Sequence, residues 1–151
     1  MTMTGLDSID TTLHKTNEWL AGVMDGLGTN DRKKAYAALR SVLHALRDRF
    51  PVATVAGLGA QLPMLVRGIY YDGWHPHLDV KLGHVRTVEE FLAVVERELP
   101  PGMELDPERA VRAVFGVVQQ HLDPNETSKI VRLLPRGLHE LWGNEVEPRD
   151  S

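Results

Sequence analysis

A pattern in the first half of the chain returns in the second half, and this repeat constrains the fold more than any other sequence feature. A Leu-Pro pair at 62–63 is followed by Tyr70, and a Leu-Pro pair at 134–135 is followed by Trp142, 72 positions later. Each aromatic residue stands seven positions after its proline. Two copies are too few for a solenoid, which stacks at least about three units. We therefore expect one domain made of two pseudo-symmetric copies.

Helix-capping residues and apolar periodicity predict the individual helices. Asp106 and Asp123 each precede a proline, which places a carboxylate at the helix N-cap and proline at the first helical position. Thr87 and Glu90 form a capping box, and Asp31 starts an earlier helix. Apolar residues then recur at helical spacing on the second helix of each copy. We expect eight helices, near residues 10–26, 31–48, 52–61, 63–72, 87–99, 107–121, 124–133 and 135–142.

These helices predict an all-α fold, a bundle of about eight helices built from two pseudo-symmetric four-helix copies. The chain has 151 residues, enough to bury ~68–70% of its unfolded surface without metals or disulfides. We expect a single helical domain over residues 1–143, followed by a flexible tail at 144–151. Within the domain, copy one spans about 10–72, a linker spans 73–86 and copy two spans 87–143.

The composition limits the classes of function. The chain contains no cysteine, which excludes disulfides, cysteine-ligated zinc, iron–sulfur clusters and thiol catalysis. Its formal net charge of −4 argues against extensive nonspecific binding of phosphate groups. The amino terminus lacks the pattern of a secretory signal, and no apolar stretch approaches the ~20 residues that span a bilayer. We expect a cytoplasmic protein with no membrane partner and no cofactor.

Several residues of both halves together resemble a known family. They are Gln61-Leu62-Pro63, Tyr70, Gly73-Trp74, Pro76, Glu90-Phe91-Leu92, Leu134-Pro135 and Leu141-Trp142. The chain resembles, over roughly residues 14–143, the bacterial and archaeal family known as domain of unknown function 2267. The resemblance implies an all-helical orthogonal bundle. It implies no activity and no functional residues.

The linker between the copies holds the best candidate for a metal site. His75 and His77 are separated by one residue, so their imidazoles can face the same way on extended backbone, with Asp79 or His84 as a third donor. Pro76 restricts the backbone between the two histidines, and the ligand spacing of known zinc motifs is absent. Exposed histidines, or histidines packed on a nearby tryptophan, explain the same residues without a metal.

Two aromatic residues near the linker, Tyr71 and Trp74, are candidate contacts for a partner protein. Exposed aromatic clusters favour protein–protein contacts. The alternative for Trp74 is structural, because its indole can bury against both copies and donate a hydrogen bond to a carbonyl oxygen. The sequence favours this structural role, and the contact role fails if both side chains are fully buried.

The predicted helix at 31–48 and the residue directly after it contain many basic side chains. This basic cluster suggests nucleic-acid binding as a further hypothesis. The basic residues are Arg32, Lys33, Lys34, Arg40, Arg47 and Arg49. Asp48 interrupts this cluster, and the corresponding helix of copy two has no matching set, so a solvated charged face is favoured. Ser41 and His44 can touch on one helix face, but no Gly-x-Ser-x-Gly motif surrounds the serine, and we expect no enzymatic activity.

Two hypotheses for function remain. The favoured one is a noncatalytic protein, in a stress or regulatory setting, that acts through binding to another protein or to itself. The alternative is a domain that binds a small ligand or a metal in the cleft between the copies, with Arg67, His75, His77 and His139 as candidate lining residues. Nucleic acid is the least favoured partner.

Overall fold

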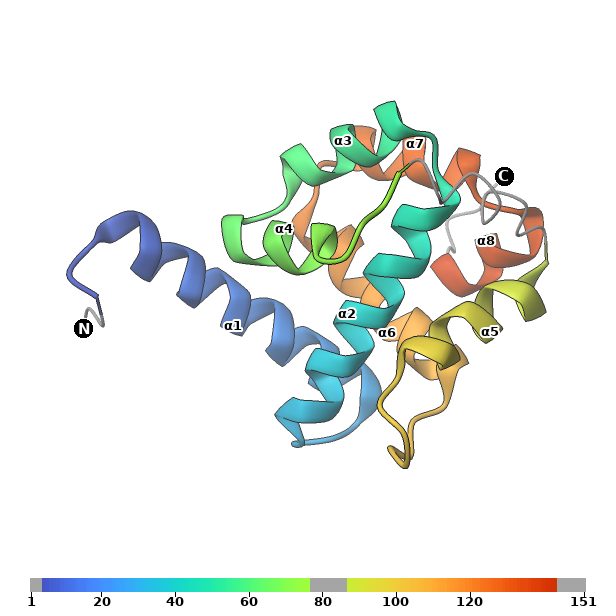
Figure 1. Ribbon diagram of the computed structural model, residues 1–151, viewed down its shortest axis with the longest axis horizontal. Coiled ribbons are helices and arrows are strands. Elements are labelled where there is room, and N and C mark those ends of the chain that lie inside the picture. Colours follow the sequence, from blue (N-terminus) through green and yellow to red (C-terminus); the bar gives the residue numbers. More distant parts are fainter. Residues whose placement is uncertain (1–3, 77–86, 144–151) are drawn as a thin grey trace.

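The protein is all-α in the computed structural model, which describes residues 4–76 and 87–143. Within these ranges the chain forms eight helices that pack on one another, as the sequence predicts (Figure 1). None of these helices is both long and apolar enough to cross a lipid bilayer. The predicted tail at 144–151 lies outside the described residues. The helices are α1 Asp7–Leu27, α2 Arg32–Arg49, α3 Val52–Gln61, α4 Met64–Tyr71, α5 Val88–Glu98, α6 Pro107–His121, α7 Pro124–Leu133 and α8 Arg136–Trp142.

The predicted side-chain caps form at the starts of α2, α5 and α7. Asp31 accepts a hydrogen bond from the Lys33 amide at 2.9 Å, and the capping box of Thr87 and Glu90 is complete. Asp106 stands at the N-cap of α6 before a proline, as predicted, but its side chain makes no capping hydrogen bond. For α6 the proline therefore supplies the start signal, because its fixed φ suits the first helical position.

The first helix begins at Asp7, earlier than the predicted start near residue 10. The Asp10 carboxylate accepts hydrogen bonds from the amide and the hydroxyl of Thr4, at 3.0 and 2.9 Å. Both Asp7 and Asp10 lie in the first turn, where a negative charge is stabilised by the helix dipole. These polar contacts extend the helix beyond the stretch in which apolar periodicity is visible.

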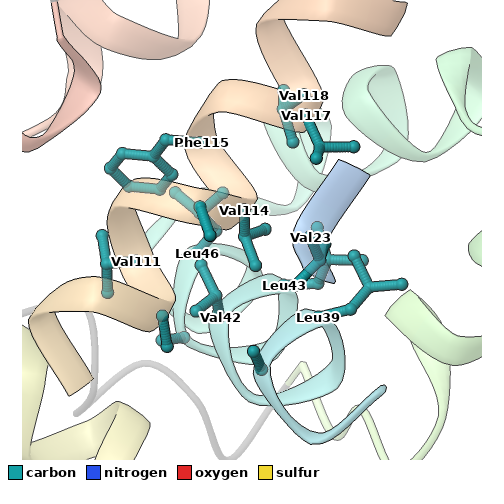
Figure 2. Packing of buried hydrophobic residues seen from close by; sticks show 14 of the residues in the cluster. Val23, Leu39, Val42, Leu43, Leu46, Val111, Val114, Phe115, Val117 and Val118 are labelled. Atoms are coloured by element: carbon teal, nitrogen blue, oxygen red, sulfur yellow. The ribbon is translucent and has the colours of Figure 1, made fainter. Parts of the chain in front are cut away.

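The centre of the molecule is formed by α1, α2 and α6, which pack against one another. Figure 2 shows the valines of α6 and the aliphatic side chains of α2 facing each other, with Val23 of α1 beside them. The predicted core stripes are confirmed, because all eight of their members are buried: Leu39, Val42, Leu43, Leu46, Val114, Val117, Val118 and Leu122.

Close contact between α1 and α6 depends on two glycines of α1. A Cβ atom added at Gly26 would lie 3.0 Å from the Cα atom of Ala113, and one added at Gly22 would lie 2.9 Å from a methyl of Val117. Separations this short leave no room for a side chain, so both glycines allow the helices to approach closely. This packing role was not predicted from the sequence.

Two pairs of hydrogen bonds occur at corresponding positions of the two halves. Arg67 donates to the Leu62 carbonyl at 2.8 Å, and 72 positions later His139 lies 3.2 Å from the Leu134 carbonyl. The second pair has the same offset of 72 positions: Arg47 donates to the carbonyl of Tyr70, and Gln119 donates to the carbonyl of Trp142. These contacts agree with the repeat, although the full equivalence of the two halves as copies stays a prediction.

Candidate functional site

The basic side chains of α2 mostly serve the internal structure. Arg47 is only 4% exposed and lies between α2 and the end of α4. Its Nη1 atom donates to the carbonyl oxygens of Tyr70 and Asp72, both at 3.0 Å, and its Nε atom donates to Asp48 at 2.8 Å. Asp48, which interrupts the basic cluster in the sequence, is thus the partner of the buried guanidinium.

Three more members of the basic set are engaged within the chain. Arg40 donates to the Asp72 carboxylate at 2.8 Å, and this hydrogen bond holds the pKa of Asp72 below its ordinary value. Arg49 donates to the Leu133 carbonyl at 3.1 Å, and Arg32 donates to the Asn17 side chain at 2.6 Å. Binding of nucleic acid to this helix would have to use the remaining lysines or displace these bonds.

His44 completes the connection between α2 and α4. Its Nε2 atom lies 2.7 Å from the Ile69 carbonyl and its Nδ1 atom lies 3.2 Å from the Glu98 carboxylate, while the side chain is buried. Ser41 donates instead to a carbonyl of its own helix, that of Ala38. The serine and the histidine are therefore directed to different partners. We call Arg40, His44 and Arg47 the α4 clamp, because together they hold the carboxyl end of α4.

Tyr71 and Trp74 are both half-buried. They are therefore neither the exposed cluster of the contact hypothesis nor the fully buried pair that would exclude it. Their ring centroids are 5.6 Å apart, and both side chains pack against the hydrophobic core. The ring of Tyr71 also lies 4.9 Å from that of Tyr70, whose hydroxyl donates to the Val55 carbonyl. Each of the two half-buried rings keeps an accessible part, so their contact with a partner stays a prediction.

Two glycines of α3 provide a matched test of how Tyr71 packs. A Cβ atom at Gly59 would clash with the Tyr71 hydroxyl and would lie 2.7 Å from its ring, whereas one at Gly57 would meet open space. We expect Gly59→Ala to lower the free energy of unfolding by about 1–3 kcal/mol through overpacking. Gly57→Ala should raise it by up to about 1 kcal/mol, because alanine favours the helix. Urea unfolding measures both, and equal effects would contradict the contact with Tyr71.

The candidate metal ligands fall mostly outside the described residues. His77, Asp79 and His84 belong to that part of the chain, and His75 is exposed. Among residues 4–76 and 87–143, no three His, Cys, Asp or Glu side chains are grouped to hold a metal ion. The linker metal site stays a prediction.

The cleft residues proposed with those histidines have local contacts in separate halves. Arg67 donates to the Gly59 and Leu62 carbonyls, at 2.9 and 2.8 Å, and so holds the corner between α3 and α4. His139 makes the corresponding contact with Leu134 in the other half. Both side chains have a structural role that the sequence did not predict.

A groove does lie between the halves, but other residues line it. One of its lining side chains is Tyr36, which is 42% exposed on α2. Around Tyr36 the wall is apolar, and the groove has a volume of about 660 Å³, within the range of about 300–1,000 Å³ that is typical of binding pockets. The apolar members of the wall are Leu20, Ala37, Pro100 and Met103. We call this site the Tyr36 groove.

The rim of the Tyr36 groove has more positive charge than negative. Its charged residues are Arg32, Lys33, Arg40 and Glu98. Arg40 is paired with Asp72, and Glu98 contacts the buried His44. Arg32 contacts only a neutral amide, and Lys33 has no ion pair with a described residue, so these two charges are not compensated. The groove therefore offers an apolar wall next to free positive charge.

The sequence contained a partial signal for this groove. Tyr36 stands among Arg32, Lys33, Lys34 and Arg40, which in the sequence form a basic cluster. An aromatic residue within a basic helix face is a pattern seen at interfaces, where tyrosine and arginine are enriched. No pattern connects Tyr36 with Met103, which reaches the groove from the connection between α5 and α6.

Comparisons with known proteins agree with the resemblance noted in the sequence. No curated protein matches the chain. The model of one family, described as "Uncharacterized conserved protein (DUF2267)", matches residues 16–141. This match includes all or part of every helix described above. The chain therefore belongs to the family known as domain of unknown function 2267.

Proposed function

We propose that this protein is a noncatalytic binding protein whose docking surface is the Tyr36 groove. The partner is another protein, and the part that docks is a segment with an apolar side chain next to carboxylates. The observation that carries the proposal is Tyr36 itself, a large aromatic side chain left 42% exposed in a mostly apolar groove. A cytoplasmic location and a stress or regulatory role stay predictions.

The composition of the groove supports a protein partner. Tyrosine, methionine and arginine are enriched in protein interfaces, and Tyr36, Met103 and Arg40 meet here. Residues that contribute most to binding are often aromatic or arginine side chains in a pocket that excludes water. An apolar side chain of the partner would cover the ring of Tyr36 and the Met103 side chain.

The charge of the rim supports an acidic partner segment. Arg32 and Lys33 keep uncompensated positive charge beside the groove, within a chain whose formal net charge is −4. Carboxylates near the apolar anchor of the partner would pair with these groups and speed association. A basic segment would be repelled here, so the rim also provides specificity.

Tyr71 and Trp74 are proposed as a second contact for the same partner. Asp72, directly after Tyr71, is bonded to Arg40, and Arg40 lines the groove. This ion pair connects the end of α4 to the groove. A partner segment longer than the groove would reach the half-buried aromatic rings from there.

The test uses random peptides displayed on phage and selected against the full chain. We expect selected peptides to combine an apolar or aromatic residue with Asp or Glu, and to bind Tyr36→Ser about tenfold or more weakly than the wild type. Lys33→Glu should weaken the same peptides and reduce their salt dependence. Synthetic copies of the peptides, measured by fluorescence polarisation, give the affinities.

Val52→Ser is the matched control, because Val52 is 57% exposed on α3 and does not line the groove. The proposal predicts unchanged peptide binding for this variant. Peptides without acidic residues, binding that survives Tyr36→Ser, or binding that is lost in Val52→Ser instead would each overturn it. Trp74→Ala tests the second contact, which is excluded if every selected peptide binds this variant as tightly as the wild type.

A further inference from the structure

A second cleft lies on a different part of the molecule and has a polar wall. It is formed by α1, by the corner between α3 and α4, and by the end of α6, with a volume of about 380 Å³. It shares no lining residue with the Tyr36 groove. Four of its side chains are hydrogen-bond donors or can become donors, and each comes from a different helix: Lys15, Gln61, Arg67 and His121. We call it the Lys15 cleft.

These four side chains have donor groups that make no hydrogen bond with another described residue. Lys15 and Gln61 form no side-chain hydrogen bond or ion pair with another described residue, and both are exposed. The Arg67 guanidinium carries five N–H groups. It uses Nε and Nη2 for the Gly59 and Leu62 carbonyls, and its Nη1 group remains available. Arg67 is thus fixed in place by the corner, lines the cleft and still has N–H groups that can donate.

His121 is also fixed in place. Its ring stacks on the indole of Trp19, with centroids 5.1 Å apart and planes inclined by 22°. Trp19 is only 1% exposed, so it is a rigid support for the imidazole. The ring nitrogens of His121 have no hydrogen-bond partner among the described residues. Rigid support lowers the entropy that a ligand contact would otherwise remove.

The charge of the cleft is positive. Lys15 and Arg67 are cations, and the one carboxylate in the wall is that of Glu18. Glu18 lies 3.2 Å from the Nε2 atom of His14, on the exposed side of α1. Positive charge and free donors from four helices are therefore gathered in a small space, although the whole chain is acidic.

We propose that the Lys15 cleft binds the phosphate group of a small phosphorylated metabolite. A phosphate has several oxygens that accept hydrogen bonds in different directions, which suits donors that enter from four helices. Lys15 and Arg67 supply the charge, and Gln61 and His121 supply further hydrogen bonds. The volume leaves room for a small body, such as a sugar, beside the phosphate.

The test is a titration of the full chain, followed by NMR, with glucose 6-phosphate and with inorganic phosphate at constant ionic strength. We expect saturable shifts at the amides of Lys15, Met64 and Arg67, with tighter binding of the sugar phosphate. Lys15→Gln should weaken binding about tenfold because it removes a positive charge from the cleft. His121→Gln should have an effect of similar size, because it removes the imidazole that the ring of Trp19 supports. Arg67 is left unchanged because it also holds the corner between α3 and α4.

Lys129→Gln is the matched control, because Lys129 is an exposed lysine on α7 that does not line the cleft. We expect it to leave the affinity unchanged, and thermal unfolding should show that all three variants remain folded. Succinate distinguishes phosphate from carboxylate. The proposal is wrong if succinate binds as tightly as glucose 6-phosphate, if Lys129→Gln weakens binding as much as Lys15→Gln, or if no phosphate compound gives saturable shifts.

Discussion

Replacing Trp142 with alanine is expected to lower the free energy of unfolding by about 3–5 kcal/mol. Trp142 is the last residue of α8 and is 7% exposed, and its ring centroid lies 4.8 Å from that of Phe115 on α6. Removal of the indole would leave a cavity next to Phe115. The short α8 would also lose this aromatic contact with α6, and a helix of seven residues has little stability of its own.

Urea unfolding followed by circular dichroism measures this loss, with Leu133→Ala as the control. Leu133 is 42% exposed on α7, so its truncation should change the free energy of unfolding by less than about 0.5 kcal/mol. Trp142→Phe should lie between the two variants, because it keeps an aromatic ring against Phe115. If Trp142→Ala were as mild as the control, Trp142 would not be the residue that closes the second half of the core.

The helices could be predicted from the sequence because their signals are local. A capping box such as that of Thr87 and Glu90 acts within one turn, and a core stripe such as Leu39, Val42 and Leu43 follows from helical spacing alone. The start of α1 was missed because Thr4 and Asp10 contribute polar contacts there without apolar periodicity. Local chemistry was sufficient for the helices and their approximate bounds.

The candidate sites could not be predicted in the same way, because they depend on contacts between distant parts of the chain. Arg47 looks like a surface residue in the sequence, but its partners include the carbonyls of Tyr70 in α4 and of Asp72 just after it, 23 and 25 positions away. Arg67 and His139 looked like cleft residues and are held at two separate corners. The Tyr36 groove needs Met103 from the other half, and the Lys15 cleft needs His121.

The α4 clamp gives the second large effect, since Arg47→Ala is expected to lower the free energy of unfolding by about 3–5 kcal/mol. Arg47 is buried and donates to the Tyr70 and Asp72 carbonyls as well as to Asp48. Alanine would leave two carbonyl oxygens without this donor and the half-buried Asp48 carboxylate without this cation. Burial of such groups without a partner is unfavourable in free energy, because their lost hydrogen bonds with water are not replaced.

Arg40→Ala provides the contrast within the same clamp. Arg40 and Asp72 also form an ion pair, but the Asp72 carboxylate is exposed, and solvent screening leaves an exposed pair with little effect on stability. Arg47→Lys should cost less than Arg47→Ala, because the lysine keeps a charge but not the fork of donors that holds both carbonyls. In hydrogen exchange, the amides of α4 should lose protection in Arg47→Lys before those of α6. If Arg40→Ala and Arg47→Ala lowered the free energy of unfolding equally, burial would not set the strength of this clamp. The end of α4 would then be held mainly by the apolar packing of Val66 and Tyr70.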